Sequence, residues 1–259
     1  MGILNVTPDS FSDGGSYLEL MTAVSHAQKM VSEGAHIIDV GGESTRPGAA
    51  EVSSEEELIR ILPVIRRLVE EVKVPISVDT YKAKVAEQAL ESGAHMINDV
   101  WGMQREPDIA VVAANYDVPV IIMHNQHGTT YLKDIIEEIK IFFQKSIDIG
   151  LRAGMKEKHI ILDPGIGFGK TPEQNIEVMS RLGELNDLGY ALLLGTSRKS
   201  MIGKILDLPS DERVEGTVAT TVMGIIQGID IVRVHDIKEN LRAAIVADAI
   251  VRSKIPWIK

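Results

Sequence analysis

A single (β/α)₈ TIM barrel of the α/β class is the fold that the sequence predicts, and three observations support it. The chain has 259 residues, close to the roughly 250 that are typical of one such barrel. Eight short runs rich in Val, Ile and Leu alternate with longer amphipathic segments, which indicates a parallel sheet with helices between its strands. The runs are almost continuously apolar, as expected of parallel strands buried on both faces. We therefore expect one domain over residues 1–259.

The predicted strands and helices follow one another regularly. Gly34, Gly93 and Gly189 each stand shortly before a strand, where glycine is the expected end of the preceding helix. An open doubly wound sheet would often carry a glycine-rich dinucleotide turn after its first strand, and residues 41–48 follow the second strand with a different spacing. The predicted strands are 2–6, 37–41, 75–79, 96–100, 119–124, 160–163, 191–195 and 231–235, and the clearest helices are 55–72, 82–92, 133–153 and 214–227.

Charge and composition exclude several classes of partner. The net charge of −10 repels phosphate backbones, so we expect no nucleic-acid partner. No run approaches the roughly 18 apolar residues that a membrane helix needs, and the first nine residues lack the pattern of a signal peptide. The absence of cysteine fits a reducing compartment. We expect a cytoplasmic protein that acts on small molecules, without nucleic acid or membrane.

Polar side chains stand at the end of nearly every predicted strand. Active sites of TIM barrels lie at the carboxyl ends of the strands, so a ring of such residues predicts an active site there. Asp39 and Asp99 could instead tether loops, His124 could be satisfied by its neighbours, and residues 55–57 are expected to decorate a helix N-terminus. The ring consists of Asn5, Asp39, Asp79, Asn98, Asp99, His124, Asp163, Ser197, Lys199, Arg233 and His235.

The residue types in this ring indicate two kinds of ligand group. Asp79, Asn98 and Asp163 offer acceptors and an amide, which suits a planar heterocycle with N–H groups, and Lys199 could bond the same ring. Arginine matches phosphate oxygens, so Arg46, Arg233 and His235 form a plausible anion site. Asn5 could give a neutral oxygen to Mg²⁺, which commonly binds through substrate phosphates.

Seven segments of the sequence resemble the signatures of one enzyme family, the dihydropteroate synthases. The first is NVTPDSFSDGG at residues 5–15, and the second is DVGGESTRPG at residues 39–48. The others are SVDT at 77–80, INDV at 97–100, DPGIGFGKT at 163–171, SRKS at 197–200 and RVHD at 233–236. The two long loop signatures are highly specific, and all seven occur in order along essentially the whole chain.

The resemblance implies an enzyme of folate synthesis and a role for each matching residue. The family condenses 6-hydroxymethyl-7,8-dihydropterin diphosphate with p-aminobenzoate, which gives 7,8-dihydropteroate and pyrophosphate. Mg²⁺ is the implied cofactor, with Asn5 as its ligand, and a homodimer is the implied assembly. The implied pterin site is Asp79, Asn98, Met123, Asp163, Phe168 and Lys199; the diphosphate site is Thr45, Arg46, Arg233 and His235; the p-aminobenzoate site is Phe11, Thr45, Pro47, Lys199 and Ser200. The catalytic residues among them would be Asp79, Asp163, Lys199, Arg233 and His235.

The chemistry favours departure of the leaving group before attack of the amine. An aryl amine is a weak nucleophile, and no strong base is obviously placed to activate it. We therefore expect an SN1-like route in which positive groups stabilise the departing diphosphate. The family usually carries residues before the first signature, so we also expect that part of the barrel bottom is missing from a chain that begins at this point.

Alternative functions on the same fold would require different residues and loops. A methyltetrahydrofolate:corrinoid methyltransferase would share the pterin-facing residues but has no need of the first-loop signature or of Arg46, Arg233 and His235. A non-catalytic pterin-binding paralogue would be expected to lose such residues. A phosphosugar barrel enzyme would more naturally show a glycine-rich phosphate loop after its last two strands.

Overall fold

The structure is a computed structural model that describes residues 1–6, 17–44 and 50–253. Within these residues eight parallel strands lie side by side in sequence order. The strands are β1 (Gly2–Asn5), β2 (Ile38–Gly41), β3 (Ile76–Asp79), β4 (Met96–Asp99), β5 (Val120–Met123), β6 (Ile160–Asp163), β7 (Ala191–Leu194) and β8 (Ile231–Val232). Each lies within one of the predicted strand ranges.

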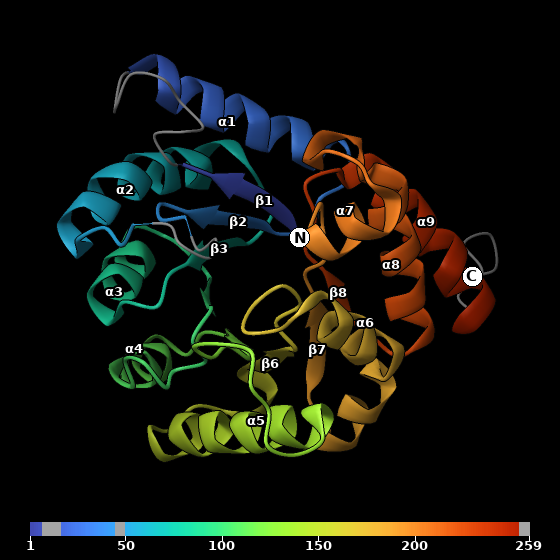
Figure 1. Ribbon diagram of the computed structural model, residues 1–259. Coiled ribbons are helices and arrows are strands. Elements are labelled where there is room, and N and C mark those ends of the chain that lie inside the picture. The colour runs from blue at the N-terminus through green and yellow to red at the C-terminus, as the bar shows by residue number, and fades with distance from the viewer. Residues whose placement is uncertain (7–16, 45–49, 254–259) are drawn as a thin grey trace.

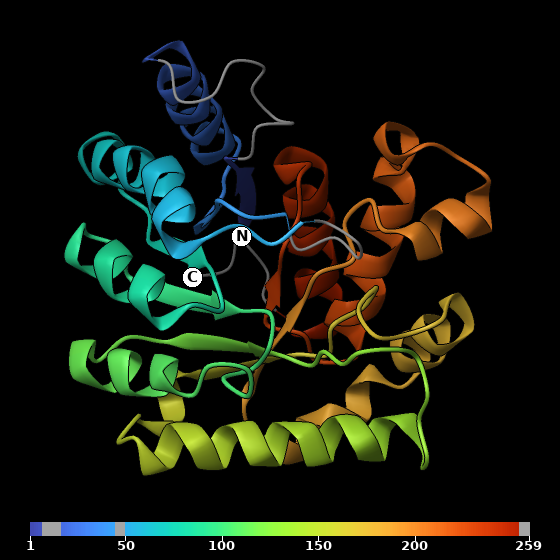
Figure 2. The same ribbon diagram turned by 60° about the vertical axis from the view of Figure 1, so that its left-hand side comes forward.

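Helices alternate with the strands and form a ring outside them (Figure 1). The predicted helix bounds agree with the structure to within two residues at each end. The helices are α1 (Tyr17–Ser32), α2 (Ser54–Glu71), α3 (Ala83–Glu91), α4 (Asp108–Tyr116), α5 (Ile135–Arg152), α6 (Pro172–Ser180), α7 (Ser200–Leu206), α8 (Val214–Ile226) and α9 (Ile237–Val251). Short 3₁₀ segments are η2 (Glu157–His159), η3 (Leu182–Leu188) and η4 (Ser210–Glu212). The turned view in Figure 2 shows the long helix α5 crossing the outside of the sheet.

The sheet closes on itself between its last and first strands. The backbone N–H of Val234 donates to the carbonyl of Met1 at 3.0 Å, and that of Ile3 donates to the carbonyl of Val234 at 3.1 Å. The predicted strand 231–235 is found as the shorter β8, and beyond it Val234 forms a separate parallel bridge with Gly2 of β1. The result is the predicted eight-stranded parallel barrel.

Alternate residues of each strand face opposite sides, which places one apolar layer outside the sheet and another inside it. Outward residues such as Val40, Val78 and Leu162 are buried beneath the helices. The inward residues form a separate apolar cluster at the bottom of the barrel, which comprises Met1, Met96, Ile121, Ile161 and Leu193. This double burial is the physical reason why the strands read as continuous apolar runs.

Glycine ends three of the helical segments at the predicted positions. Gly34, Gly93 and Gly189 all have positive φ, between 79° and 103°, so the backbone turns there in the left-handed region. This conformation is favourable for glycine because it lacks a Cβ atom.

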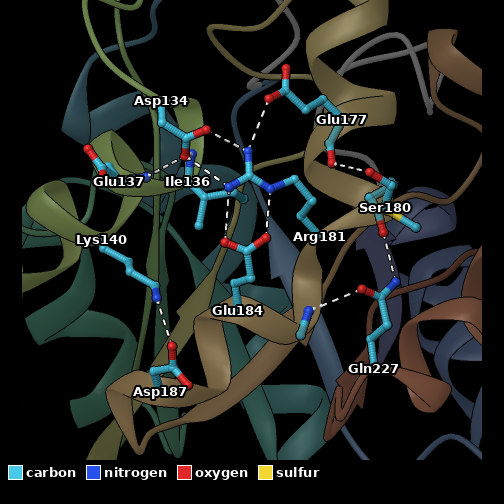
Figure 3. A network of polar contacts seen from close by, with 12 residues as sticks. Asp134, Ile136, Glu137, Lys140, Glu177, Ser180, Arg181, Glu184, Asp187 and Gln227 are labelled. Atoms are coloured by element: carbon cyan, nitrogen blue, oxygen red, sulfur yellow. Dashed lines mark hydrogen bonds and ion pairs between the residues drawn. The ribbon is translucent and has the colours of Figure 1, made fainter.

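An exposed network of charges connects the ends of α5 and α6 (Figure 3). Arg181 follows α6 directly, and its Nη1 lies 2.6 Å from Asp134 Oδ2, while its Nε lies 2.7 Å from Glu184 Oε1. Asp134 is the N-cap of α5, where its side chain accepts from the N–H groups of Ile136 and Glu137. This cluster lies on the outer ring and fixes the helices rather than the site.

Candidate active site

A polar layer lies directly above the apolar floor of the barrel. Two residues beyond Met96 and Ile161, on the same inward face, the strands carry Asn98 and Asp163. Asp79 pairs in register with Asn98, and Asp163 pairs with Met123. Because side chains alternate between the two faces of a strand, the predicted pterin-facing residues of β3 to β6 lie at one level inside the barrel. They are buried there.

Arg233 lies between two buried carboxylates of this layer. Its Nε donates to Asp39 Oδ2 at 2.6 Å, and its Nη2 donates to Asp79 Oδ2 at 2.7 Å. Asn98 Nδ2 donates to the same oxygen of Asp39 at 3.0 Å. We expected Arg233 in an anion site with Arg46 and His235. Among the described residues it forms ion pairs with Asp39 and Asp79, so Asp39 joins the site, and the anion-binding role of Arg233 stays a prediction.

The charges of this cluster shift the protonation of its members. Burial raises the pKa of Asp79 to about 7, and the guanidinium of Arg233 opposes that shift. Burial disfavours the charge on Arg233, but Asp39 and Asp79 outweigh it and raise the pKa of the guanidinium. The Oδ1 atoms of Asp39 and Asp79 and the hydroxyl of Ser77 are buried without a hydrogen-bond partner among the described residues. Buried acceptors of this kind favour a ligand that brings N–H groups to them.

Lys199 and Asp163 form the other side of the pocket. Asp163 Oδ1 accepts from the N–H of Gly165 at 2.8 Å, and Lys199 Nζ donates to the carbonyl of Ile166. The ammonium of Lys199 also lies 4.6 Å from the centre of the Phe168 ring. Burial lowers the pKa of Lys199 to about 8, although Asp163 opposes this shift. Burial likewise raises the pKa of Asp163.

His235 is oriented by the hydroxyl of Ser197. Ser197 Oγ accepts from the backbone N–H of His235 at 3.1 Å and lies 2.9 Å from His235 Nδ1. We assign the hydroxyl proton to the bond with Nδ1, which leaves the ring proton on Nε2. Next to this pair, Arg198 forms a bidentate ion pair with Asp236. The SRKS and RVHD segments are thus joined across the ends of β7 and β8.

A cavity of about 490 Å³ opens beside Phe168 on the side of β3 to β5. Met123, Tyr81 and Val100 form a buried cluster against which Trp101 and Phe168 pack. Arg105 lies over the rings of Tyr81 and Trp101, at 4.3 Å and 5.4 Å from their centres. Tyr81, Trp101 and Arg105 were not predicted as site residues, although each lies in the segment between β3 or β4 and the following helix, where a barrel places functional residues.

Asp99 and His124 have structural partners. Asp99 accepts from the N–H groups of Trp101 and Met103 at 2.8 Å and 2.6 Å, so it holds the turn after β4. Burial raises its pKa to about 7. His124 is 2% exposed and its Nδ1 lies 2.9 Å from the ammonium of Lys170, a residue that sequence analysis did not single out.

Buried ion pairs hold the residues that flank positions 45–49. Lys82 Nζ donates to Glu43, to Glu57 Oε2 at 2.6 Å and to the carbonyl of Val52 at 2.8 Å. Tyr81 donates its hydroxyl proton to Glu43 at 3.0 Å. Residues 55–57 do begin α2 as expected, but Glu57 is buried against Lys82 rather than displayed to solvent.

The remaining predicted site residues are either outside the described part of the chain or exposed at its surface. Phe11, Thr45, Arg46 and Pro47 lie outside the described residues. Asn5 is exposed at the end of β1, and Ser200 is exposed as the first residue of α7, directly after Lys199.

The residues present fit a magnesium ion held mainly by substrate. The described residues contain no group of three or more His, Cys, Asp or Glu side chains arranged to hold a metal. Asn5 offers one neutral oxygen at the exposed end of β1, the strand that pairs with the segment after β8 that carries Arg233 and His235. Because Mg²⁺ keeps several waters and binds through one or two protein groups plus phosphates, one such ligand is compatible with it.

Comparison with known proteins gives the class of this barrel. The family described as "Pterin binding enzyme" matches residues 1–235, a span that contains every strand and the whole polar layer. The fold and the site therefore define a pterin-binding barrel enzyme.

Relatives then identify the family within this class. The chain is 57% identical to the dihydropteroate synthase of Clostridium beijerinckii, an alignment that covers 97% of this chain and 94% of the relative. It is 55% identical to that of Bacillus subtilis, covering 96% and 87%. The chain belongs to the dihydropteroate synthase family.

Solved structures agree with this assignment. A crystal structure of the Clostridium difficile dihydropteroate synthase, obtained in the presence of pteroic acid, matches with a TM-score of 0.96 and 60% identity over 97% of this chain and 96% of that chain. The Yersinia pestis enzyme in a sulfonamide drug complex matches with a TM-score of 0.91 and 46% identity, covering 98% and 94%. None of the helices within the described residues is long and apolar enough to cross a membrane.

Proposed function

We propose that the chain condenses 6-hydroxymethyl-7,8-dihydropterin diphosphate with p-aminobenzoate to give 7,8-dihydropteroate and pyrophosphate. Membership of the dihydropteroate synthase family supports this reaction. The observation in the structure that carries it is the buried polar layer of Asp79, Asn98 and Asp163 above an apolar floor, with the half-buried Lys199 beside it.

The polar layer suits the pyrimidine edge of a pterin. Asp79 Oδ1 has no donor among the described residues, so it can accept from a ring N–H or an amino group of the ligand. Asp163 Oδ2 lies in the same layer, and Lys199 can donate to a ring nitrogen or carbonyl. Met123 and Phe168 would provide the apolar wall of the slot. A flat, N–H-rich ring would donate hydrogen bonds to acceptors that have no donor among the described residues.

The reaction that we propose is SN1-like. The bond between the pterin methylene carbon and the diphosphate oxygen breaks first, and its electron pair leaves with the diphosphate. Electron release from the dihydropterin ring stabilises the cationic methylene. The amine nitrogen of p-aminobenzoate then forms the new bond and loses a proton. If Arg233→Met left turnover intact and weakened only pterin binding, the role of Arg233 in leaving-group departure would be wrong.

Positive and polar groups at β8 would stabilise the leaving charge. Arg233 and His235, together with Arg46, are the residues that we assign to the diphosphate, and Thr45 would join them. In our assignment the ring proton of His235 is on Nε2, the atom that would donate to a phosphate oxygen. Fixed donors of this kind are typically worth about 3–4 kcal/mol of transition-state stabilisation.

Mg²⁺ is the cofactor that we propose, with Asn5 as its protein ligand. When bound, it would supply a Lewis acid to the diphosphate oxygens. Phe11, Thr45, Pro47, Lys199 and Ser200 are the residues that we assign to p-aminobenzoate. Because a relative has been solved with a sulfonamide drug, we also propose that sulfonamides compete at this subsite.

Binding and turnover experiments test the proposal directly. Isothermal titration with the pterin diphosphate and Mg²⁺ should show binding, and p-aminobenzoate should bind afterwards. Pyrophosphate release should depend on p-aminobenzoate. Absence of binding by both substrates would overturn the proposal, and so would methyl transfer to a corrinoid in place of pyrophosphate release.

We further propose a homodimer that works in the cytoplasm. The support for the homodimer is a set of exposed apolar side chains on two adjacent helices, Met223 and Ile226 of α8 and Ile245, Val246 and Ile250 of α9. The lack of cysteine suits a reducing compartment, and fractionation of the native cells tests the location.

A further inference from the structure

Lys170 is a buried lysine at the end of the loop after β6, and it lines the cavity beside Phe168. Its ammonium has three hydrogen-bond acceptors within reach: His124 Nδ1 at 2.9 Å, the carbonyl of Gly165 at 3.0 Å and the carbonyl of Phe168 at 3.1 Å. An ammonium group carries three donors, so this set satisfies it completely. Burying a lysine without such partners would be strongly unfavourable.

The three acceptors connect the loop after β6 to β5. Residues 165–169 contain three glycines with positive φ, at Gly165, Gly167 and Gly169. Such a loop has few side chains of its own to fix its path. Lys170 draws the carbonyls at its two ends together, while Asn175 accepts from the N–H of Gly167 at 2.6 Å.

The backbone of His124 also contacts this loop, in addition to the contact between its side chain and Lys170. A Cβ atom on Gly165 would lie 2.0 Å from the carbonyl oxygen of His124, so the two backbones are in direct contact. The imidazole is itself held by aromatic neighbours, with its centre 4.9 Å from that of Phe142 and 6.1 Å from that of Tyr131. These contacts hold the imidazole that accepts from Lys170 in one position.

The outer side of this loop presents groups to the pterin slot. Gly165 donates its N–H to Asp163, Ile166 offers its carbonyl to Lys199, and Phe168 lies beneath the ammonium of Lys199. We propose that Lys170, braced by His124, is a positioning residue that fixes this loop, and thereby Phe168, Asp163 and Lys199, in the geometry that binds the pterin. The inference rests on the proposed function, because it assigns the pterin to that slot.

We call the contact between Lys170 and His124 the brace. The test compares substitutions that remove this contact with one that keeps it. Lys170→Met removes the three donors, and His124→Phe removes the acceptor while keeping an aromatic ring. His124→Asn keeps an oxygen acceptor near the position of Nδ1. Thr221→Val is the control for general loss of stability, because it removes a buried hydrogen bond to Asn240 between α8 and α9. Each variant is titrated with the pterin diphosphate and Mg²⁺, and kcat and both KM values are measured below its melting temperature.

The brace predicts a selective loss of pterin affinity. Lys170→Met and His124→Phe should raise the Kd and KM for the pterin by about 10-fold to 100-fold, since small misplacements of binding groups have effects of that size. The KM for p-aminobenzoate at saturating pterin should change much less. His124→Asn should bind nearly as wild type does, and the double variant of Lys170→Met with His124→Phe should be no weaker than Lys170→Met alone.

Other outcomes separate this inference from the function on which it rests. Wild-type pterin affinity in folded Lys170→Met would overturn it. An equal loss of pterin affinity in Thr221→Val would overturn it as well, because general destabilisation would then explain the effect. If Lys170→Met did not fold, equal affinities of His124→Phe and His124→Asn would count against it. A wild-type protein that binds no pterin would instead refute the proposed function.

Discussion

Arg233 is the residue on which the two buried carboxylates of the site depend. It is the cation that neutralises both Asp39 and Asp79 at 2.6 Å and 2.7 Å. Removal of one partner from a buried ion pair leaves an uncompensated charge, which typically costs about 3–5 kcal/mol. Buried carboxylates can escape that cost by taking up protons.

We expect Arg233→Met to lower the free energy of unfolding at pH 7.5 by about 3–5 kcal/mol. The loss should shrink at pH 5.5, because burial raises the pKa of Asp79 to about 7, so this carboxyl would then be neutral in the folded protein. Urea denaturation at the two pH values measures this. Arg181→Met, in the exposed network of Figure 3, should have a smaller effect. An equal loss for Arg233→Met at both pH values would contradict the prediction.

His124 makes the folded protein sensitive to acid. Burial, and after it the charge of Lys170, lowers its pKa from 6.5 to about 2. The unfolded chain therefore binds a proton below pH 6.5 that the folded protein does not bind. The stability that depends on a neutral His124 is present above pH 6.5 and is lost as the pH falls toward 2.

His124→Asn should remove this dependence. Between pH 6 and pH 4.5 the unfolding free energy of the wild type should fall more steeply than that of the variant, by up to about 1.4 kcal/mol per pH unit. Chemical denaturation of both proteins across this range measures the difference in slope. Parallel curves would show that His124 takes up a proton in the folded state.

At the scale of single elements, the loop after β6 shows how sharply the backbone is constrained near the site. Gly165 and Gly189 have similar φ values of 68° and 79°. A Cβ on Gly189 would meet nothing within 4 Å, whereas one on Gly165 would lie 2.0 Å from the carbonyl oxygen of His124. The two positions therefore separate the cost of a left-handed backbone from the cost of a steric clash.

Gly189→Ala should lower stability by about 1–2 kcal/mol, the usual cost of a left-handed residue. Gly165→Ala should lose about 1–3 kcal/mol more, because its methyl group overpacks against β5. Gly165→Ala should also weaken pterin binding, while Gly189→Ala should leave it unchanged. Denaturation and calorimetric titration measure the two effects. Similar losses of stability for both variants would mean that the loop moves away freely.

At the scale of the whole molecule, the outer face of α8 and α9 carries a group of exposed apolar side chains. Isolated exposed apolar residues are ordinary, but a group of them on neighbouring helices is typical of an interface.

We expect Ile245→Glu to convert a dimer into a monomer, because a charge would be buried at the interface. Light scattering coupled to size-exclusion chromatography measures the mass. Leu132→Glu is the control: Leu132 is 92% exposed and lies far along the chain from α8 and α9, so its change should not alter the assembly. A wild-type protein that remains monomeric at high concentration would contradict the homodimer.

The sequence alone determined the barrel and the level at which its site lies. Strand and helix positions follow from local periodicity, because a buried parallel strand must be apolar on both faces and a covering helix on one. Asp79, Asn98 and Asp163 could be selected because each ends such a strand. The same local signals give no information on which side chains meet, so the partners of Arg233 and the role of Lys170 were not predicted.

Only the tertiary structure decided those partners. Arg233 reaches Asp39 and Asp79 because barrel closure brings β8 beside β1, so residues 194 and 154 positions apart come into contact. Lys170 meets His124 because β5 and β6 are neighbours and the glycine-rich loop folds back on them. Hydrogen bonds and ion pairs act over a few ångströms, and only the closed barrel sets distances on that scale. Periodicity along the chain fixes which face a residue occupies, and closure fixes what it touches.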